Sequence, residues 1–324
     1  MSQSKSTVAV TNKIPDAGIK LFQDKFELKI GPTDRTLKAA ELLSFVKGAA
    51  AILPLLGNKI DGRVMDAAGK QLKIVANYAV GYDNIDLAAA KKRKVIVTNT
   101  PGVLTEAVAE HAFTLLTAVA RRIVESDKFL RAGKYKSWMP ELLLGPQLQG
   151  KTLGIIGLGR IGSRVAEIGA LGYGMKVIYF DRGKKDRELD KKIGAEAASL
   201  RKILTASDFI SLHVPLTPQT RHLIGRVELA TMKKSAILIN TSRGPVVDEV
   251  ALAAALQHKV IWGAGLDVFE FEPQFTPALK KLDNVVMTPH TASATHEARD
   301  EMAILAAKNI ISVLAGQAPL TEVK

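Results

Sequence analysis

Short apolar runs alternate with longer amphipathic segments along almost the whole chain. In the first hundred residues, runs typical of strands lie at residues 7–11, 26–30, 49–55, 73–79 and 94–99. Between them, the spacing of apolar positions predicts helices, such as those over residues 15–26 and 34–48. Strands that alternate with helices in this way are typical of a parallel sheet covered by helices on both faces.

A second alternating series begins near residue 150, after a long apolar segment that separates it from the first. In that segment we expect one long helix, which starts after Pro101 and Gly102 and ends near Gly133. Strands are then predicted at residues 152–157, 176–181, 208–214, 236–241, 263–268 and 284–289. A last helix is predicted over residues 295–316.

This pattern also predicts the domain organisation. A chain of 324 residues is long for a single hydrophobic core, so we expect two domains. A doubly wound, parallel-sheet nucleotide-binding domain would cover residues 101–290, including the long helix. A flavodoxin-like substrate domain would be formed by residues 1–100 and completed by residues 291–324. The predicted fold is therefore α/β, with two Rossmann-like domains.

Composition excludes several kinds of chemistry. The chain has no cysteine, which removes disulfides, thiol nucleophiles, iron–sulfur clusters and cysteine-ligated zinc, and we predict no metal site. The first residues do not resemble a secretory signal, and the apolar stretch around Pro54 is too short to span a bilayer. We expect a globular protein of the cytoplasm with no membrane partner.

The formal net charge of +13 raises the question of a nucleic-acid partner. The strongest basic run, Lys91 to Lys94, lies between a predicted helix and a predicted strand. Cations at a helix C-terminus favour the helix dipole, and no aromatic side chains interleave with this run. We therefore predict no nucleic-acid partner, and we note that a positive surface attracts small anions.

A glycine motif predicts the cofactor site. Residues 157–162 read Gly157-Leu158-Gly159-Arg160-Ile161-Gly162, between a predicted strand and a predicted helix. In a dinucleotide fingerprint, the first glycine allows a tight turn, the second allows close approach of the pyrophosphate, and the third allows the helix to pack on the strand. A glycine-bearing turn without a ligand is the structural alternative, but the strand–turn–helix context favours the fingerprint.

The next predicted strand ends in Asp181, nineteen residues after Gly162. A carboxylate there accepts hydrogen bonds from both hydroxyls of the adenine ribose, which favours NAD(H). The basic residues that follow, Arg182, Lys184 and Lys185, could hold a 2′-phosphate instead. NAD(H) is therefore the favoured cofactor and NADP(H) the alternative.

Three titratable or charged residues follow consecutive predicted strands, namely Arg243, Glu272 and His290. Because ligands collect at the carboxyl ends of strands in open α/β sheets, we expect the three at one edge. Reduction of a 2-oxo acid needs a hydride from the cofactor and a proton, which histidine donates near neutral pH. A carboxylate neighbour favours the imidazolium and fixes its tautomer, while arginine holds an acid by two parallel donors. We therefore predict His290 as the acid, Glu272 as its partner and Arg243 as the substrate clamp.

Taken together, the motifs of the chain resemble those of the D-isomer-specific 2-hydroxyacid dehydrogenase family over essentially its whole length. "GLGRIG", "LHVPLTPQTRHLIG", "ILINTSRGPVVDE", "GAGLDVFEFEP" and "TPHTASATHEAR" match family motifs in order. "NYAVGYDNIDL" and "SWMPELLLG" resemble the glyoxylate/hydroxypyruvate reductase branch most closely. The resemblance implies reduction of glyoxylate to glycolate or of hydroxypyruvate to D-glycerate, and catalytic roles for Arg243, Glu272 and His290.

The resemblance implies further contacts and a partner. Val80 and Gly81 would bind the substrate carboxylate, and Trp138 would reach the active site of a second subunit in a homodimer packed through the long helix. Asp267 would contact the nicotinamide amide, and Thr241 would lie beside the cofactor. D-Lactate or D-3-phosphoglycerate chemistry stays open as an alternative, as does a non-enzymatic NAD(H)-sensing protein similar to corepressors. Of the other histidines, His111 is expected in packing or at an interface, and His213 is expected to pack near the cofactor. His222 and His258 are expected at the surface, and His296 in an exposed first turn of the last helix.

Overall fold

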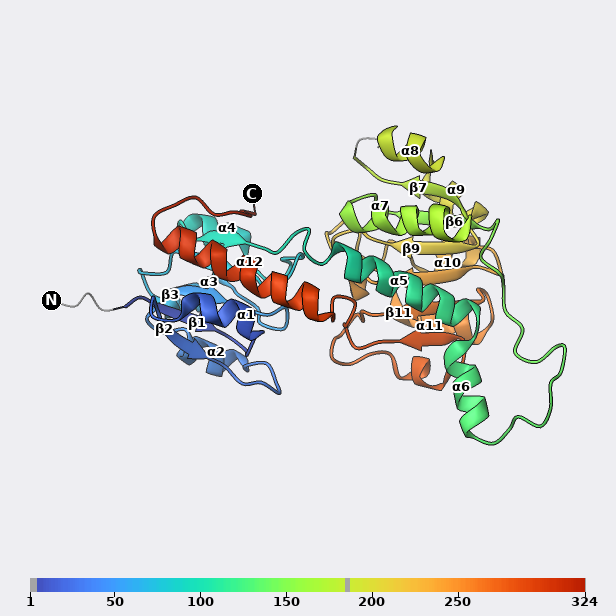
Figure 1. Ribbon diagram of the computed structural model, residues 1–324, viewed down its shortest axis with the longest axis horizontal. Coiled ribbons are helices and arrows are strands. Elements are labelled where there is room, and N and C mark those ends of the chain that lie inside the picture. Colours follow the sequence, from blue (N-terminus) through green and yellow to red (C-terminus); the bar gives the residue numbers. More distant parts are fainter. Residues whose placement is uncertain (1–4, 184–186, 324) are drawn as a thin grey trace. The chain divides into compact units, whose positions relative to one another are not determined.

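The computed structural model describes residues 5–183 and 187–323, and the chain divides into two compact units. Unit 1 consists of Met1–Leu104 and Ala294–Lys324, and unit 2 of Thr105–Ser293. The boundaries expected from the sequence, at residues 100 and 291, lie close to these bounds. Each unit is an α/β domain with its own parallel sheet (Figure 1).

The sheet of unit 1 has the strand order β2-β1-β3-β4-β5, with all pairings parallel. Its strands are β1 (Thr7–Val10), β2 (Glu27–Ile30), β3 (Ala49–Leu53), β4 (Ile74–Ala76) and β5 (Ile96–Thr98). The helices are α1 (Asp16–Ile19), α2 (Ala39–Phe45), α3 (Gly62–Ala68), α4 (Leu87–Lys92) and α12 (His296–Leu314), with a 3₁₀ turn η1 (Lys20–Phe22). This is the flavodoxin order, as the sequence predicted.

Two predicted helices of unit 1 are shorter than expected. The helix expected over 15–26 ends at Phe22, where the chain turns, and Asp24 has a φ of 61°. The helix expected from residue 34 begins only at Ala39, because Glu41 accepts a hydrogen bond from the Lys38 amide and pairs with Arg35. In the second case, local side-chain bonds hold the flanking residues outside the helix.

The sheet of unit 2 has the strand order β12-β11-β10-β9-β6-β7-β8, again with all pairings parallel. Its strands are β6 (Thr152–Ile156), β7 (Lys176–Phe180), β8 (Glu196–Ala197), β9 (Phe209–Leu212), β10 (Ile237–Asn240), β11 (Gly263–Leu266) and β12 (Val285–Met287). The short strand β8 was not predicted. The strand order reverses between β6 and β9, so ligands are expected above the carboxyl ends of these strands.

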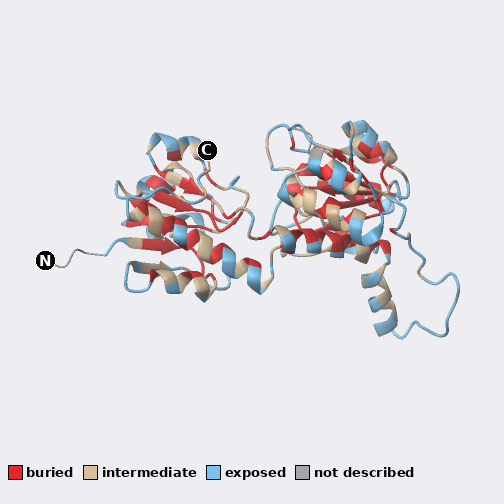
Figure 2. Ribbon diagram, turned by 45° about the horizontal axis from the view of Figure 1, so that its top comes forward, coloured by how far each residue is buried: buried red, intermediate tan, exposed pale blue. Residues whose placement is uncertain are grey.

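Helices cover the sheet of unit 2, and its strands are the most buried part (Figure 2). The helical elements are α5 (Thr105–Ala120), α6 (Ile123–Arg131), α7 (Arg160–Glu167), η2 (Ile168–Gly172), α8 (Arg187–Ile193), α9 (Leu200–Ala206), α10 (Arg226–Thr231), η3 (Gly244–Val246), α11 (Glu249–Gln257) and η4 (Pro277–Lys281). Nearly every residue of β6, β9, β10 and β11 is buried, as expected for strands covered on both faces.

The prediction of one long helix after Pro101 is wrong, because two helices, α5 and α6, occupy the segment. The break lies at Arg122, which has a φ of 52° in the left-handed region. The Arg122 guanidinium pairs with Glu125 at 2.7 Å and donates to the carbonyl oxygen of Leu144 at 3.3 Å. Nine residues of α5 are buried and none of α6, so α6 leaves the core of its unit.

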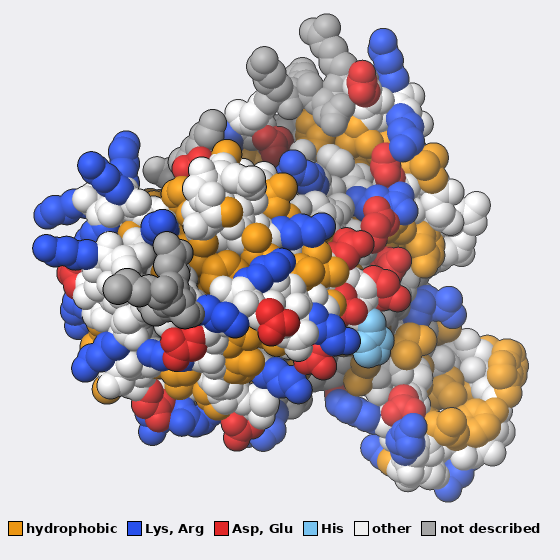
Figure 3. Space-filling view, turned by 60° about the vertical axis from the view of Figure 1, so that its left-hand side comes forward, with side chains coloured by type: hydrophobic (Ala, Val, Ile, Leu, Met, Phe, Trp, Pro, Cys, Tyr) orange, Lys and Arg blue, Asp and Glu red, His pale blue; other side chains and the backbone are white. Residues whose placement is uncertain are grey.

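Basic side chains do not form a continuous stripe on the face in Figure 3. Lys and Arg side chains are scattered there among acidic and apolar ones. Within the run 91–94, the Arg93 guanidinium pairs with Asp66 at 2.7 Å. No helix in the described part of the chain is both long enough and apolar enough to cross a membrane.

Candidate active site

The glycine motif forms a tight turn between β6 and α7. Gly157 has a φ of 96°, and a Cβ there would lie 2.6 Å from the carbonyl oxygen of His213. A Cβ on Gly162 would lie 2.0 Å from the carbonyl oxygen of Gly157, so the helix packs directly on the turn. A Cβ on Gly159, by contrast, would meet no atom within 4 Å. Two glycines are thus required by packing within the chain, and the third leaves open space at the start of α7.

Asp181 lies directly after β7 and faces this turn. Its carboxylate accepts hydrogen bonds from the Leu158 amide at 2.6 Å and from the Gly183 amide at 2.6 Å. A carboxylate has about four lone-pair sites, so two remain for hydroxyl donors. Arg182 is exposed beside it, whereas Lys184 and Lys185 lie outside the described residues.

A cavity of about 340 Å³ lies above the carboxyl ends of β6, β7 and β9. Its lining includes Gly157, Gly159, Asp181 and the segment from His213 to Pro215. This is the point where the strand order reverses, and the open space at Gly159 lies at the N-terminus of α7. Free amides and a positive helix end suit a pyrophosphate, so the residues present fit a dinucleotide.

The turn after β10 carries Thr241 and Arg243. Buried Asn240 shapes it, because its side chain accepts hydrogen bonds from the Ser242 amide and hydroxyl and donates to the Arg243 carbonyl at 2.9 Å. The Thr241 hydroxyl is buried and has no hydrogen-bond partner among the described residues. A buried polar atom of this kind calls for a partner, and a bound ligand would supply one.

The Arg243 turn is packed against the loop after β11. A Cβ on Gly244 would lie 1.9 Å from the carbonyl carbon of Phe269, so only glycine fits between the two backbones. The same loop carries Glu272. Burial acts to raise the pKa of that carboxyl, and the charge of Arg243 is the smallest of several causes that together lower it. The ends of β10 and β11 therefore bring Arg243 and Glu272 together, as the order of residues along the chain predicted.

Glu272 and His290 form the centre of the site. The Nδ1 atom of His290 lies 2.8 Å from Oε2 of Glu272, and the Phe269 amide donates to Oε1 at 3.0 Å. Partial burial acts to raise the pKa of Glu272, but these hydrogen bonds and the charges of His290 and Arg243 outweigh it and lower the pKa. Glu272 is thus an ionised partner that fixes Nδ1 and leaves Nε2 of His290 for another group.

The backbone at His290 has an unusual conformation. Its φ of 54° lies in the left-handed region, which side chains with a Cβ rarely adopt. The His290 amide donates to the carbonyl oxygen of Asp267 at 2.9 Å. The Asp267 carboxylate, fully buried, accepts from the amides of Thr291 at 2.7 Å and Ala292 at 2.8 Å. Asp267 therefore fixes the turn that presents the imidazole, and its expected contact with nicotinamide stays a prediction.

The sequence indicates packing or an interface for His111, but it does not indicate the contacts that this side chain makes at the end of β12. Its Nε2 atom lies 2.9 Å from the Thr288 hydroxyl and 3.5 Å from the Asp267 carboxylate. Burial acts to raise the pKa of Asp267, yet hydrogen bonds from His111, Thr288 and two backbone amides lower it. A histidine on a helix facing a strand end gives no signal in the sequence, because its partner Thr288 lies 177 positions away.

The remaining histidines show different environments. Burial lowers the pKa of His213 to about 3, and its Nε2 atom lies 2.8 Å from the Ser211 hydroxyl. A neutral imidazole that needs such acidity to take up a proton is unsuited to be the proton donor. His222 was expected to be a plain surface residue, but it pairs with Glu270 at 2.7 Å. His296 is exposed in the first turn of α12, as expected.

Three residues with predicted substrate contacts, Val80, Gly81 and Trp138, lie in unit 1 and in the loop after α6. In unit 1, the Val80 carbonyl accepts from Asn99 and the Gly81 carbonyl accepts from Asn77, both at 2.7 Å. Because the peptide is planar and trans, the Gly81 N–H points away from Asn99. Trp138 lies in the loop after α6 and is 77% exposed. Substrate contacts of Val80, Gly81 and Trp138 stay predictions.

The fold and this geometry together define a nicotinamide-dinucleotide oxidoreductase. Residues 113–292 match the family described as D-isomer specific 2-hydroxyacid dehydrogenase, NAD binding domain. A glyoxylate reductase of Thermococcus litoralis is 51% identical over 97% of this chain and 96% of its own length. The chain therefore belongs to the D-isomer-specific 2-hydroxyacid dehydrogenase family.

Solved structures agree with this assignment. A protein from Thermus thermophilus shares 44% identity and a TM-score of 0.91, over 98% of this chain and 100% of that one. An NADPH-dependent glyoxylate/hydroxypyruvate reductase from Sinorhizobium meliloti, solved with NADP and malonate, shares 33% identity and a TM-score of 0.85. That match covers 99% of this chain and 97% of the other.

Proposed function

We propose that the protein reduces glyoxylate to glycolate and hydroxypyruvate to D-glycerate. The observation that carries the proposal is the 2.8 Å contact between His290 and Glu272, beside Arg243 at the carboxyl edge of the sheet. A relative 51% identical to this chain is named glyoxylate reductase, and a structural neighbour is named for both substrates. Activity toward D-lactate or D-3-phosphoglycerate is the alternative within the family.

In the proposed reaction, His290 transfers the proton and Glu272 stabilises the charge of its imidazolium. NAD(P)H, when bound, supplies a hydride to the carbonyl carbon of the oxo acid. His290, as imidazolium, gives its Nε2 proton to the carbonyl oxygen as that oxygen gains the electron pair of the C=O bond. The products are the hydroxy acid and a neutral imidazole, which takes a new proton from water. Glu272 holds Nδ1 and balances the positive charge before transfer.

We propose that Arg243 binds the substrate. Its guanidinium carries five donors in a planar fork, which suits a carboxylate or a carboxylate and its neighbouring carbonyl oxygen. Within the turn, Nη1 donates to the Ser242 carbonyl at 2.8 Å, which helps to orient the guanidinium. The carbonyl, drawn toward the guanidinium, becomes more electrophilic as negative charge develops on its oxygen.

We propose NAD(H) as the preferred cofactor, with NADP(H) as the alternative. Asp181 faces the glycine turn with two acceptor sites left for a ribose diol, and a 2′-phosphate there meets a like charge. Of the three cations predicted to hold a 2′-phosphate, the structure describes Arg182, which is exposed.

The first test is turnover of purified protein with glyoxylate, hydroxypyruvate and pyruvate, each with NADH and then NADPH, followed by absorbance at the nicotinamide band. We expect rapid oxidation with the first two substrates. His290→Gln keeps a polar side chain but has no titrating proton, so turnover falls at least about a hundredfold while NADH binding persists. Turnover of the variant at the wild-type rate contradicts the assignment of His290.

We also propose that the protein is a homodimer, and the surface around α6 supports this. Helix α6 and the loop after it carry exposed apolar side chains, whereas α5 is mostly buried in its own unit. The exposed apolar residues here are Ile123, Leu130, Tyr135, Trp138, Met139, Leu142, Leu144, Leu171 and Tyr173. An apolar surface of this extent is typical of an interface.

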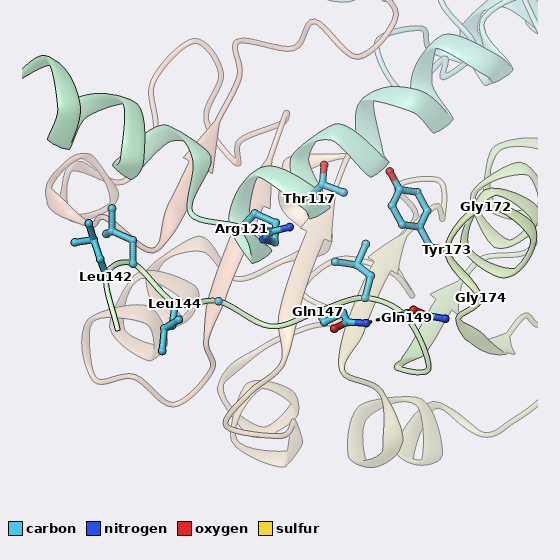
Figure 4. Close-up of a pocket in the computed structure, with 12 residues that line it drawn as sticks. Thr117, Arg121, Leu142, Leu144, Gln147, Gln149, Gly172, Tyr173 and Gly174 are labelled. Atoms are coloured by element: carbon cyan, nitrogen blue, oxygen red, sulfur yellow. Dashed lines mark hydrogen bonds between the residues drawn. The ribbon is translucent and has the colours of Figure 1, made fainter. Parts of the chain in front are cut away.

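The same region contains a cavity of about 990 Å³ between α5, the loop 142–149 and Tyr173. Figure 4 shows Leu142 and Leu144 on the loop, and Arg121, which directly follows α5, between Leu144 and Tyr173 in this view. We expect a second copy of the chain to cover this region. Leu130→Asp should then convert a dimer to a monomer in sedimentation measurements, whereas Val227→Asp, at an equally exposed position on α10, should not. A dimer that persists in Leu130→Asp contradicts the proposed interface.

A further inference from the structure

The loop that carries Glu272 is exposed at its tip. It runs from Val268 to Thr276, and residues 271–274 are exposed. The Gln274 amide donates to the Phe271 carbonyl at 2.9 Å, which closes the tip into a narrow turn. Little burial holds Glu272 in place, yet its Oε2 must stay within hydrogen-bond distance of His290. The position of Glu272 therefore depends on how the two stems of the loop are anchored.

One buried carboxylate anchors both stems. Glu249, the first residue of α11, is 3% exposed. Its Oε2 accepts from the Glu270 amide at 2.8 Å, and its Oε1 accepts from the Thr276 amide. The two donors lie on either side of Glu272 in the chain. The bonds thus close the loop across its base, with Glu272 between them.

This carboxylate is not needed to cap its own helix. Asp248 does that, since its side chain accepts from the Ala251 amide at 2.9 Å. Burial of a carboxylate is costly unless several donors meet it, and here each oxygen receives a backbone amide from the loop. A carboxylate has two oxygen atoms that can each accept a hydrogen bond, whereas glutamine would turn an NH₂ group toward one of the two amide donors.

Glu270, at the base of the same loop, has its own anchor. Its Oε1 lies 2.7 Å from Nε2 of His222 and 3.7 Å from Nη1 of Arg221. The Arg221 guanidinium offsets the negative charge of Glu270 next to Glu249, and the His222 imidazole is a hydrogen-bond partner of the same carboxylate. The carboxylate of Glu249 is therefore left to the loop amides. The titratable and charged groups beside the loop are Glu270, His222 and Arg221 at its base, and His290 and Arg243 next to Glu272.

We infer that Glu249 is a positioning residue, whose buried carboxylate clamps the base of the 268–276 loop so that Glu272 meets His290. The inference rests on the proposed function, because Glu249 acts only through Glu272. Without the clamp the loop keeps its sequence and its charge, but the Glu272 carboxylate no longer lies against Nδ1. The imidazolium then loses the negative neighbour that stabilises its charge, so a smaller fraction of the protein holds the proton at a given pH.

The test is a double-mutant cycle on the full chain with NADH and glyoxylate. Glu249→Gln, Glu272→Gln and the double variant are compared for kcat, KM, NADH affinity and the pH profile of kcat/KM. We expect Glu249→Gln to lower kcat about 10- to 100-fold, as misplacement of a catalytic group by about 1 Å does, with NADH affinity within about twofold. The basic limb of the profile should move to lower pH, because the proton donor has lost a neighbouring negative charge.

The double variant should be no slower than Glu272→Gln alone, since residues that act as one unit are not additive. Glu228→Gln is the matched control, because its carboxylate accepts the Gly225 amide at 3.0 Å in the first turn of α10, away from the loop. That variant should keep the wild-type kcat and pH profile. If Glu249→Gln does not fold, Glu249→Asp, with both acceptors on a shorter arm, takes its place in the cycle.

The outcomes separate the two claims. If Glu272→Gln slows turnover but Glu249→Gln does not, or if Glu249→Gln lowers only the melting temperature, the inference fails and the proposed function stands. Multiplicative losses in the double variant also overturn the inference, because the two residues then act independently. If Glu272→Gln leaves kcat and the pH profile unchanged, the proposed partner of His290 is wrong and the inference falls with it.

Discussion

Replacement of two glycines in the β6–α7 turn by alanine should separate folding from cofactor binding. A Cβ on Gly162 would lie 2.0 Å from the Gly157 carbonyl oxygen, and contacts under 3.0 Å are essentially never seen, so helix and turn must move apart by at least 1.0 Å. Overpacking of this kind costs about 1–3 kcal/mol. At about 2–4 °C per kcal/mol, Gly162→Ala should melt about 2–12 °C lower than the wild type without any cofactor.

Gly159→Ala should behave differently. The new Cβ meets no atom within 4 Å, and the φ of −79° suits any residue. The less favourable N-cap and the smaller entropy of the unfolded chain offset each other, so the melting temperature should change by no more than about 2–4 °C, or about 1 kcal/mol. The Cβ nevertheless occupies the space through which a pyrophosphate would approach the helix N-terminus. We expect NADH affinity to fall at least about tenfold, or about 1.4 kcal/mol.

Thermal melts with and without NADH measure both effects. At an NADH concentration about 100 times the wild-type Kd, binding stabilises the wild type by about 2.7 kcal/mol. A tenfold weaker Kd leaves about 1.4 kcal/mol in Gly159→Ala, so about half of the cofactor-induced shift should be lost. A full NADH shift in Gly159→Ala would refute the placement of the pyrophosphate, and a wild-type melting temperature in Gly162→Ala would refute the close packing.

Three further predictions follow from the site. Asp181→Ala should raise the ratio of kcat/KM with NADPH to kcat/KM with NADH, because the negative charge that faces a 2′-phosphate is removed. An unchanged ratio would mean that the cations after Asp181 determine the cofactor preference. Because the folded pKa of Asp267 is lowered, this carboxylate stabilises the fold above its unfolded pKa, and the stabilisation is lost as pH falls. The melting temperature of Asp267→Asn should therefore lie well below that of the wild type at about pH 7, and the difference should shrink toward about pH 3. The folded pKa of His213 is about 3 against an ordinary 6.5, so between these values the unfolded chain binds an extra proton and the wild type loses stability as pH falls. The melting temperature of His213→Gln should therefore decline less steeply with falling pH. An equal slope in the variant and the wild type would contradict the burial of this imidazole.

The sequence alone determined those features of the protein that depend on local periodicity and on the order of residues along the chain. Alternating apolar runs and helical spacings predicted both parallel sheets, because the period of side-chain burial is a local property. Arg243, Glu272 and His290 were expected together because parallel strands end at one edge. The glycine spacing in its strand–turn–helix context predicted the turn that the structure shows.

Only the tertiary structure decided which distant groups support these residues. The contact of His111 with Thr288 and the two bonds from Glu249 to the loop join positions that no local pattern relates. The break at Arg122 was missed for the same reason, since the apolar periodicity continues across it while the pairing with Glu125 and the bond to the Leu144 carbonyl redirect the chain. Such contacts depend on the packing of whole elements, which local periodicity does not encode.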